Sequence, residues 1–239
     1  MSKFERSIDE VKNILDNRLK YNLYTTEDTV RYLLYYSVLK QSGFKLDPNK
    51  ITLERKYSSF TSKNIMFLSN PGDLELDTYI EESSKTIDAI ELKYHRNNGK
   101  VSYDTTNRLG ELINEINRLI CLNDDFNKYL FYITDEEMNK YINGNSTPKE
   151  IKEFYHLNYG SKVDFVDILT SIDNKKQNKH LLEASYDSVS KIYIQNIKAL
   201  AKNYEVVSLL DYNEGKLSKS HYLRIYKLLL KSNAGYKKW

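Results

Sequence analysis

The strongest constraint on the fold is a run of three strand-like segments that lies between two helix-like ones. The segments are "KITLERKY" (50–57), "LELDTYI" (74–80) and "TIDAIELKY" (86–94), where the helical period of apolar residues is lost. The link between the last two segments, "EESSK", is short enough for a hairpin. We therefore expect three strands here, with the second and third joined as a hairpin.

Helical spacing of apolar residues flanks these strands on both sides. It covers the first twenty residues and a second segment that has Thr25 or Thr26 as its N-cap and Gly43 as its stop. It returns after residue 100, where apolar residues recur on one side from Leu109 to Ile120. These patterns predict two helices before the strands and one after them.

The run "KYLFYITD" (128–135) follows the third helix and is typical of a buried strand. A helix between two strands is the usual crossover for a parallel pair. We therefore expect an α/β fold in which a mixed sheet is flanked by helices on both faces.

The remainder of the chain predicts further helices and one more strand. Asp135 is a candidate N-cap of a short helix that ends at Gly144, and Thr147 is the candidate cap of a helix that starts at Pro148. A long helix is expected over 186–200, and "EVVSLL" (205–210) is strand-like.

The length of the chain favours a single domain. Its 239 residues can bury a sizeable core, Pro and Gly are sparse, and no low-complexity linker divides the sequence. We expect one domain over 1–239, with its core at about 25–135 and helical and strand additions with a basic tail at 136–239.

The charge is unevenly distributed. The formal net charge is only +3, but the segment from Glu214 to Trp239 carries seven Lys or Arg against one Glu, so it is +6 and the rest of the chain is −3. Such a basic end can follow a phosphate backbone, and it can equally be a solvated face of a helix.

The sequence also predicts a compartment. Cys121 is the only cysteine, which fits a reducing environment, and no N-terminal signal pattern is present. The longest apolar stretch, 32–39, is too short to span a bilayer. We expect a cytoplasmic protein with no membrane partner.

Chemistry is concentrated in the hairpin. Successive side chains of a strand point to opposite faces, so Glu91 and Lys93 share one face. The pattern of an acid, any residue and Lys occurs six times in the chain, and only this copy directly follows a strand with a matching acid. Asp77, on the preceding strand, can approach Glu91 across the hairpin.

These residues resemble the PD-(D/E)XK nucleases, the restriction-endonuclease-like superfamily. The resemblance consists of "NPGDLELD" followed, after thirteen intervening residues, by "ELK", within an αβββαβ order of elements, and it covers roughly Thr25 to Asp135. The motif is short and degenerate, and no Pro directly precedes Asp77. "Pro71-Gly72-Asp73" leaves Asp73 as a rival acid, although we expect it in the turn before the strand.

The resemblance implies a metal-dependent endonuclease that hydrolyses phosphodiester bonds in DNA, of a restriction or defence type. Asp77 and Glu91, with the carbonyl of Leu92, would bind Mg²⁺ or Mn²⁺. Lys93 would position or help to deprotonate the attacking water and offset charge in the transition state. Restriction-like enzymes commonly dimerise, so a homodimer is also implied.

Further residues are candidates around this motif. Family members often carry a Glu on the helix before the sheet, a position that Glu27 matches, whereas Glu54 on the first strand could complete a second metal site. Either can equally be a helix cap or a surface charge. The candidate nucleic-acid contacts are basic residues beyond the motif and in the C-terminal segment: His95, Arg96, Arg108, Lys216, Lys219 and Arg224. Arg118 is a further candidate, and it could instead pair with Glu115 along the helix.

Two alternatives stay open. Glu91 and Lys93 can form a buried structural ion pair, with Asp77 as a turn acid. A nuclease-like fold can also act only as a DNA-binding or protein-interaction module. The presence of Asp77, Glu91 and Lys93 together argues against this second alternative, because an inactive relative could lose one of them without harm.

Overall fold

Six consecutive elements build the half of the fold that carries the motif. A computed structural model describes the chain except residues 24, 84–85, 97–101, 146, 174–178 and 232–239, and the side chains of 102–105. After α1 (Lys3–Lys20), the six elements are α2 (Glu27–Gln41), β1 (Ile51–Lys56), β2 (Glu75–Ser83), β3 (Thr86–His95), α3 (Ser102–Ile120) and β4 (Asn127–Thr134). The predicted order of helix, three strands, helix and strand is confirmed.

Strand pairing in this half follows the expected pattern. β1 pairs with β2 and β2 with β3, both antiparallel, and β3 pairs with β4 in parallel from Asp88–Asn127 to His95–Thr134. The helix α3 is the crossover that the parallel pair requires. The protein is therefore a mixed α/β protein, as the sequence predicted.

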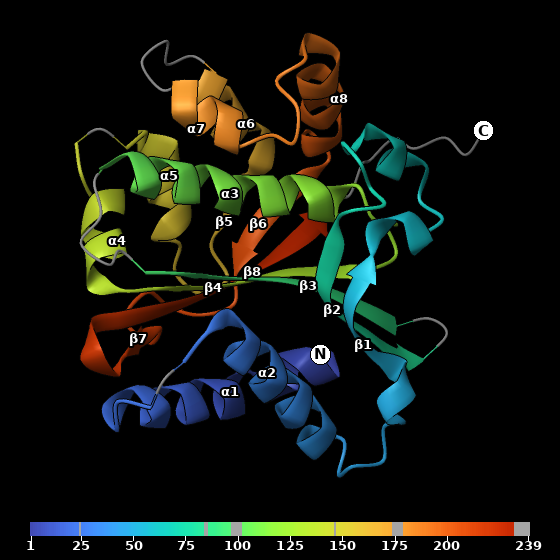
Figure 1. The fold of residues 1–239 in the computed structure, drawn as a ribbon, viewed down its shortest axis with the longest axis vertical. Helices are drawn as coiled ribbons and strands as arrows, with labels where there is room; N and C mark the ends of the chain where they lie inside the picture. The colour runs from blue at the N-terminus through green and yellow to red at the C-terminus, as the bar shows by residue number, and fades with distance from the viewer. Residues whose placement is uncertain (24, 84–85, 97–101, 146, 174–178, 232–239) are drawn as a thin grey trace.

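Helices cover both faces of the sheet (Figure 1). One apolar core lies between the sheet and the pair α1 and α2, with Val11, Leu34, Ile90 and Phe131 among its members. A second core lies on the face that α3 covers, and its members include Leu112, Ile116, Leu130 and Tyr132. Alternate residues of β4 enter opposite cores, as the pleat of a buried strand requires.

The helix starts follow local capping chemistry. Thr26 accepts a hydrogen bond from the Thr29 N–H at 3.2 Å and caps α2, and Asp135 caps α4 in the same way through Met138. The helix expected to start at Pro148 starts at Lys149, with Pro148 in the N-cap position, so the prediction that Thr147 is the cap was wrong.

Among its described residues, the C-terminal half adds four strands to the sheet and five α-helices around it. These elements are α4 (Glu136–Ile142), α5 (Lys149–Tyr155), β5 (Lys162–Asp164), α6 (Phe165–Asp173), α7 (Lys179–Ala184), α8 (Lys191–Ala201), β6 (Tyr204–Ser208), β7 (Lys216–Leu217) and β8 (His221–Leu230). The described strands form one sheet in the order β1-β2-β3-β4-β8-β6-β5, with β7 on β8. The long helix predicted over 186–200 is shorter, because Ser190 caps α8 and its first helical residue is Lys191.

The prediction of a basic tail is corrected by β8. Residues His221–Leu230 form a strand inside the sheet, antiparallel to both β4 and β6. Arg224 on this strand is 1 % exposed, and its guanidinium lies over the rings of Tyr155 and Tyr212 at 4.5 and 4.2 Å. The last residues of the basic segment, 232–239, lie outside the described residues.

Within the described parts of the chain, no helix has both the length and the apolar composition needed to cross a membrane.

Candidate active site

The site lies where β2 and β3 separate. Their ladder runs from Ser83–Thr86 to Thr78–Ile90, and Asp77 and Glu91 are the next residues on the two strands. Beyond this point Asp77 Oδ2 accepts a hydrogen bond from the Leu92 N–H at 2.7 Å. A carboxylate thus satisfies a main-chain donor of β3 where the pairing of the two strands has ended, and this contact fixes Asp77 beside Glu91.

A third acid lies on the neighbouring strand. In the β1–β2 ladder, Leu53 pairs with Thr78 and Arg55 with Leu76, so Glu54 lies opposite Asp77. Glu54 has φ of 56°, an uncommon conformation for a residue other than glycine, and it interrupts the pairing at that position. Such outliers cluster at functional sites, where the surrounding structure holds them.

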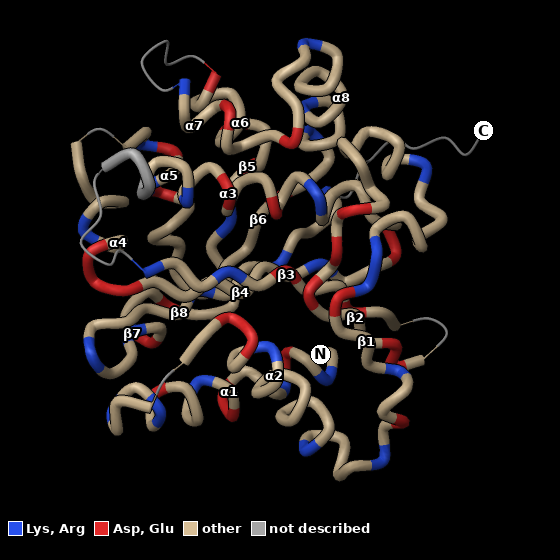
Figure 2. The backbone as a smooth tube through the Cα atoms, viewed as in Figure 1, with Lys and Arg blue, Asp and Glu red and all other residues tan. Residues whose placement is uncertain are grey.

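Arg31 on α2 links these acids. Its Nη2 atom lies 2.6 Å from Asp77 Oδ1, and its Nη1 atom lies 3.0 Å from Glu54 Oε1 and 2.7 Å from Asp28 Oδ1. The Arg31 and Asp77 side chains are 11 % and 9 % exposed. The N-terminal end of α2, where acidic and basic positions follow one another, points toward the sheet (Figure 2). Asp77 therefore has a protein cation on one oxygen and a main-chain N–H on the other.

Glu91 is the most buried acid of the motif. It is 1 % exposed, and the Tyr57 hydroxyl donates a hydrogen bond to its Oε1 atom at 2.5 Å. Burial, and then the negative charges of Glu115 and Asp77, raise the pKa of Glu91 well above its ordinary value. The neighbourhood of Glu91 thus favours an uncharged carboxyl unless a cation is added.

Lys93 does not pair with Glu91. Its Nζ atom lies 3.2 Å from Glu115 Oε1 and 3.9 Å from Glu27 Oε1, and these are its ion pairs among the described residues. The alternative of a Glu91–Lys93 ion pair is therefore wrong in that form. Burial lowers the pKa of Lys93, but the negative charges of Glu115 and Glu27 outweigh it and raise the pKa above its ordinary value, so the ammonium stays protonated.

Glu115 belongs to a second ion-pair network on α3. Arg118 Nη1 lies 3.1 Å from Glu115 Oε1, as the sequence alternative for Arg118 predicted. Arg118 Nη2 also lies 2.6 Å from Asp187 Oδ1, an acid that accepts a further hydrogen bond from Asn114 Nδ2 at 2.7 Å. These contacts tie the crossover helix to the segment before α8 and hold Glu115 opposite Lys93.

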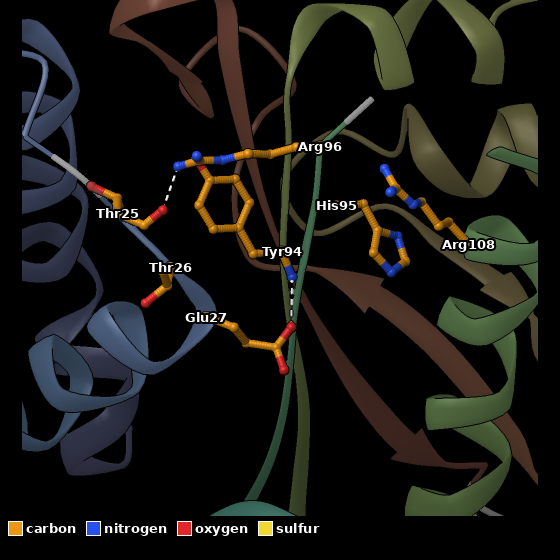
Figure 3. Close-up of a pocket in the computed structure, with 7 residues that line it drawn as sticks. All are labelled: Thr25, Thr26, Glu27, Tyr94, His95, Arg96 and Arg108. Atoms are coloured by element: carbon orange, nitrogen blue, oxygen red, sulfur yellow. Dashed lines mark hydrogen bonds between the residues drawn. The ribbon is translucent and has the colours of Figure 1, made fainter. Parts of the chain in front are cut away.

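A pocket of about 370 Å³ opens at the end of β3 (Figure 3). It is lined by the start of α2, by the last residues of β3 and by one arginine of α3: Thr25, Thr26, Glu27, Tyr94, His95, Arg96 and Arg108. Glu27 Oε2 accepts a hydrogen bond from the Tyr94 N–H at 3.1 Å, which fixes α2 against β3. Burial raises the pKa of Glu27 above its ordinary value.

The basic residues of the pocket are held in different ways. Arg96 lies over the Tyr94 ring at 4.5 Å and donates a hydrogen bond to the Thr25 carbonyl. His95 contacts Tyr132 Oη through Nδ1 at 3.2 Å, and burial lowers the pKa of its imidazole. The guanidinium of Arg108 lies beside the His95 ring in Figure 3. The structure thus brings His95, Arg96 and Arg108 together in the wall of one pocket, and Glu111 Oε2 lies 3.4 Å from His95 Nε2.

The C-terminal basic candidates differ in their exposure to solvent. Lys216 and Lys219 are exposed, and Lys219 lines a neighbouring pocket of about 300 Å³ together with Arg96. Arg224 is buried among tyrosine rings, so its predicted contact with nucleic acid is wrong for this structure. The rival acid Asp73 is exposed in the turn that precedes β2, where it was expected.

Three residues of the site were not predicted as part of it: Arg31, Tyr57 and Glu115, the last of which was expected only as a partner of Arg118. Arg31 and Glu115 each lie within the apolar stripe of a helix, beside Val30 and Leu34 in α2 and beside Leu112 and Ile116 in α3. A charged residue at such a position must find a buried partner, which is a signal that the sequence contains. Tyr57 follows β1 without any such signal.

The comparisons with known proteins add no relative. No family model matches the chain, and neither the curated proteins nor the solved structures contain a significant match. Among the side chains that the structure describes, no group of three or more His, Cys, Asp or Glu is arranged to hold a metal ion. The function therefore has to be argued from the site alone.

Proposed function

We propose that the protein is a metal-dependent endonuclease of the PD-(D/E)XK type that hydrolyses phosphodiester bonds in DNA. The observation that carries the proposal is the placement of Asp77, Glu91 and Lys93 where β2 and β3 separate within an αβββαβ core. The pocket at the end of β3, with His95, Arg96 and Arg108 in its wall, supports an anionic substrate, and Glu27 in the same wall lies 3.9 Å from Lys93.

The donor atoms fit Mg²⁺ or Mn²⁺ in number and kind. Mg²⁺ is commonly held by one or two carboxylates, with water and substrate phosphate as its other ligands, so a cluster of three acids is not required. Asp77 and Glu91 supply two adjacent carboxylates, and the Leu92 carbonyl is a third candidate ligand. Burial and the neighbouring acids Glu115 and Asp77 raise the pKa of Glu91, and a divalent cation at these carboxylates would favour the ionised form.

Each residue then has a chemical task. A bound divalent cation supplies charge stabilisation at the phosphoryl group and makes water a better nucleophile. Water attacks phosphorus and releases a proton to solvent, the bond to the leaving oxygen breaks, and that oxygen gains a proton from solvent. Lys93, held as an ammonium by Glu115 and Glu27, positions the water and offsets negative charge in the transition state. A base role for Lys93 is disfavoured by its raised pKa.

The remaining parts of the proposal rest on the resemblance. They are a restriction or defence role and a homodimer in which two sites cut two strands, whereas the proposed cytoplasmic location rests on the single cysteine and the sequence pattern. Glu54 and Glu27 are supporting acids in this proposal, because each contacts Arg31 or Lys93 and neither contacts Asp77 or Glu91 directly in the described network.

A second candidate function is a catalytically inactive nuclease-like fold that binds DNA or a protein partner. The observation in its favour is the ion pair between Arg31 and Asp77. It places a protein cation at the carboxylate oxygen where a metal ion would bind. This candidate predicts DNA binding without cleavage.

One experiment separates the two candidates. The purified chain is incubated with supercoiled plasmid, linear duplex and single-stranded DNA, each with Mg²⁺, Mn²⁺ or EDTA. Cleavage that needs the cation and falls by roughly 100-fold or more in Asp77→Asn and Glu91→Gln supports the nuclease. Asp73→Asn, an exposed turn acid, is the matched control and keeps activity. Binding of DNA by the chain, without cleavage under any of these conditions, would support the binding module.

A further inference from the structure

We propose that Arg31 is an internal cation that competes with the divalent metal for Asp77, so that it sets the metal affinity of the site. The inference rests on the proposed function, because it takes Asp77 as a metal ligand. It assigns Arg31 as a positioning residue that acts through Asp77 and does not touch the substrate.

The contacts of Arg31 indicate competition for one oxygen. Nη2 lies 2.6 Å from Asp77 Oδ1, and Asp77 Oδ2 is held by the Leu92 N–H. Oδ1 is therefore the oxygen left to bind a metal, and Arg31 covers it. A divalent cation on this oxygen would lie next to a guanidinium, and two like charges at that separation repel each other.

Arg31 has other acids to hold it when Asp77 is released. Asp28 Oδ1 and Glu54 Oε1 lie 2.7 and 3.0 Å from Nη1, and Glu27 Oε1 lies 4.0 Å from Nη2. When Asp77 is released, the guanidinium stays paired with these other acids. A small rotation about the end of the Arg31 side chain is therefore enough to free Asp77 Oδ1 for a metal ion. The Nε atom of Arg31 is buried without a hydrogen-bond partner among the described residues. The present position of the side chain therefore leaves one of its hydrogen-bond donors unsatisfied.

The direction of the effect distinguishes this role from a structural one. A purely structural arginine would keep Asp77 in place, and its removal would weaken metal binding. A competing arginine has the opposite effect, because its removal frees Asp77 Oδ1 and lowers the positive charge near the metal. The sign of the change in metal affinity therefore tests the proposal.

The experiment is a calorimetric titration of Mn²⁺ into the wild-type chain and into Arg31→Gln and Arg31→Lys. We expect the Mn²⁺ affinity of Arg31→Gln to be at least about tenfold higher than that of wild type, because a positive charge close to the metal is removed. Arg55→Gln is the matched control: Arg55 lies next to Glu54 on β1, but its guanidinium lies over the Tyr79 ring at 4.1 Å. Its affinity should stay within about twofold of wild type.

A second measurement covers a loss of folding. The thermal midpoint of Arg31→Gln should fall without metal and rise more steeply with Mn²⁺ than that of wild type. Should Arg31→Gln not fold, Arg31→Lys keeps a positive charge but cannot hold Asp28, Glu54 and Asp77 together, and it should also bind Mn²⁺ more tightly than wild type. Equal or weaker binding in the folded variants would overturn the proposal.

The outcomes also separate this proposal from the nuclease itself. Binding of Mn²⁺ by wild type that is lost in Asp77→Asn and unchanged in Arg31→Gln rejects competition by Arg31 and leaves the nuclease standing. Tighter binding in Arg31→Gln without any DNA cleavage keeps the competition and rejects the nuclease. Absence of Mn²⁺ binding in every form rejects both.

Discussion

The Nζ atom of Lys93 lies 3.2 Å from Oε1 of Glu115, a residue of the helix that crosses from β3 to β4. Glu115 is 3 % exposed and is shared with Arg118. The position of the lysine ammonium thus depends on the crossover helix and on Glu27 at the start of α2, and not on Glu91 two residues away. The position of the Lys93 charge is thus set by contacts among α2, β3 and α3, which are distant from one another in sequence.

Replacement of Lys93 by Met should remove activity with little loss of stability. Glu115 keeps Arg118 as a partner, so the free energy of unfolding should fall by no more than about 2 kcal/mol, below the usual result of breaking a buried pair. DNA cleavage should fall by roughly 100-fold or more. Both quantities can be measured by urea unfolding and by a plasmid assay.

Lys56→Met is the control for this change, because Lys56 on β1 bonds Glu75 at 2.7 Å and has no contact with the motif acids. It should keep full cleavage. A collapse of stability in Lys93→Met, with activity lost only in proportion to unfolding, would mean that Lys93 is a structural charge.

Removal of the Tyr57 hydroxyl should shift the pH midpoint of metal binding to a higher pH. The hydrogen bond from Tyr57 favours the ionised form of Glu91, so Tyr57→Phe should raise the pKa of that acid further. The metal needs the ionised form, and the midpoint of Mn²⁺ binding against pH should move upward. Tyr79→Phe, a buried tyrosine of β2, is the control. A midpoint that moves equally in both variants would contradict this role for Tyr57.

Asp88 on β3 should make stability fall as pH rises through mildly acidic values. Burial raises its pKa from 3.8 to about 6. Between these values the folded chain binds more protons than the unfolded chain, so the stabilisation is full below pH 3.8 and is lost as pH passes about 6. Asp88→Asn should remove the part of this slope that Asp88 contributes, roughly 3 kcal/mol at most, and should leave the parts from Glu27 and Glu91, whose pKa values are also raised.

The measurement is urea unfolding of wild type and Asp88→Asn from pH 4 to pH 7. The substitution leaves Asn127, whose Nδ2 donates to Asp88 Oδ1 at 2.8 Å, with an amide oxygen as its acceptor. Asp167→Asn, at an exposed position of α6, should keep the wild-type slope. The same slope in Asp88→Asn would place its origin in another group.

The basic candidates that remain exposed should govern the salt dependence of DNA binding. Replacing Lys216 and Lys219 together by Gln should lower the magnitude of the slope of log affinity against log salt by about 0.9 for each phosphate that these lysines neutralise. Anisotropy across a salt series in Ca²⁺ measures this slope. Lys149 and Lys179, which are 81 % and 78 % exposed, provide a control pair of the same charge. An equal effect of both pairs would indicate a general charge effect and no defined DNA path.

The segment up to Ile142 was predictable because its patterns are local. Alternation, helical spacing and caps such as Thr26 and Asp135 determine α2, α4 and the four strands without reference to distant partners. The end of the chain was mispredicted because β8 carries Arg224 and Lys227 inside the sheet. Their charges suggested a solvated tail, whereas Arg224 lies among tyrosine rings and Lys227 bonds Glu5 at 2.7 Å.

The candidate site was predictable only in part. The hairpin placed Asp77 near Glu91, and the pleat put Glu91 and Lys93 on one face. The partners of these residues come from α2, from the end of β1 and from α3, and single-sequence patterns contain no information on which charged residue of one element meets which residue of another. The contacts of Arg31 with Asp77 and of Glu115 with Lys93 were therefore not predicted, although the pair between Glu115 and Arg118 was.

The place of β8 has a consequence for how the chain is made. It separates β4 from β6, yet the ribosome completes it long after β4, which ends at Thr134, whereas β8 begins at His221. At ordinary rates of translation this leaves one side of an apolar strand, "NKYLFYIT", unpaired for on the order of ten seconds. Open strand edges pair readily with other chains. The nascent chain is thus most exposed to mispairing just after the strands that carry Asp77 and Glu91 have been synthesised.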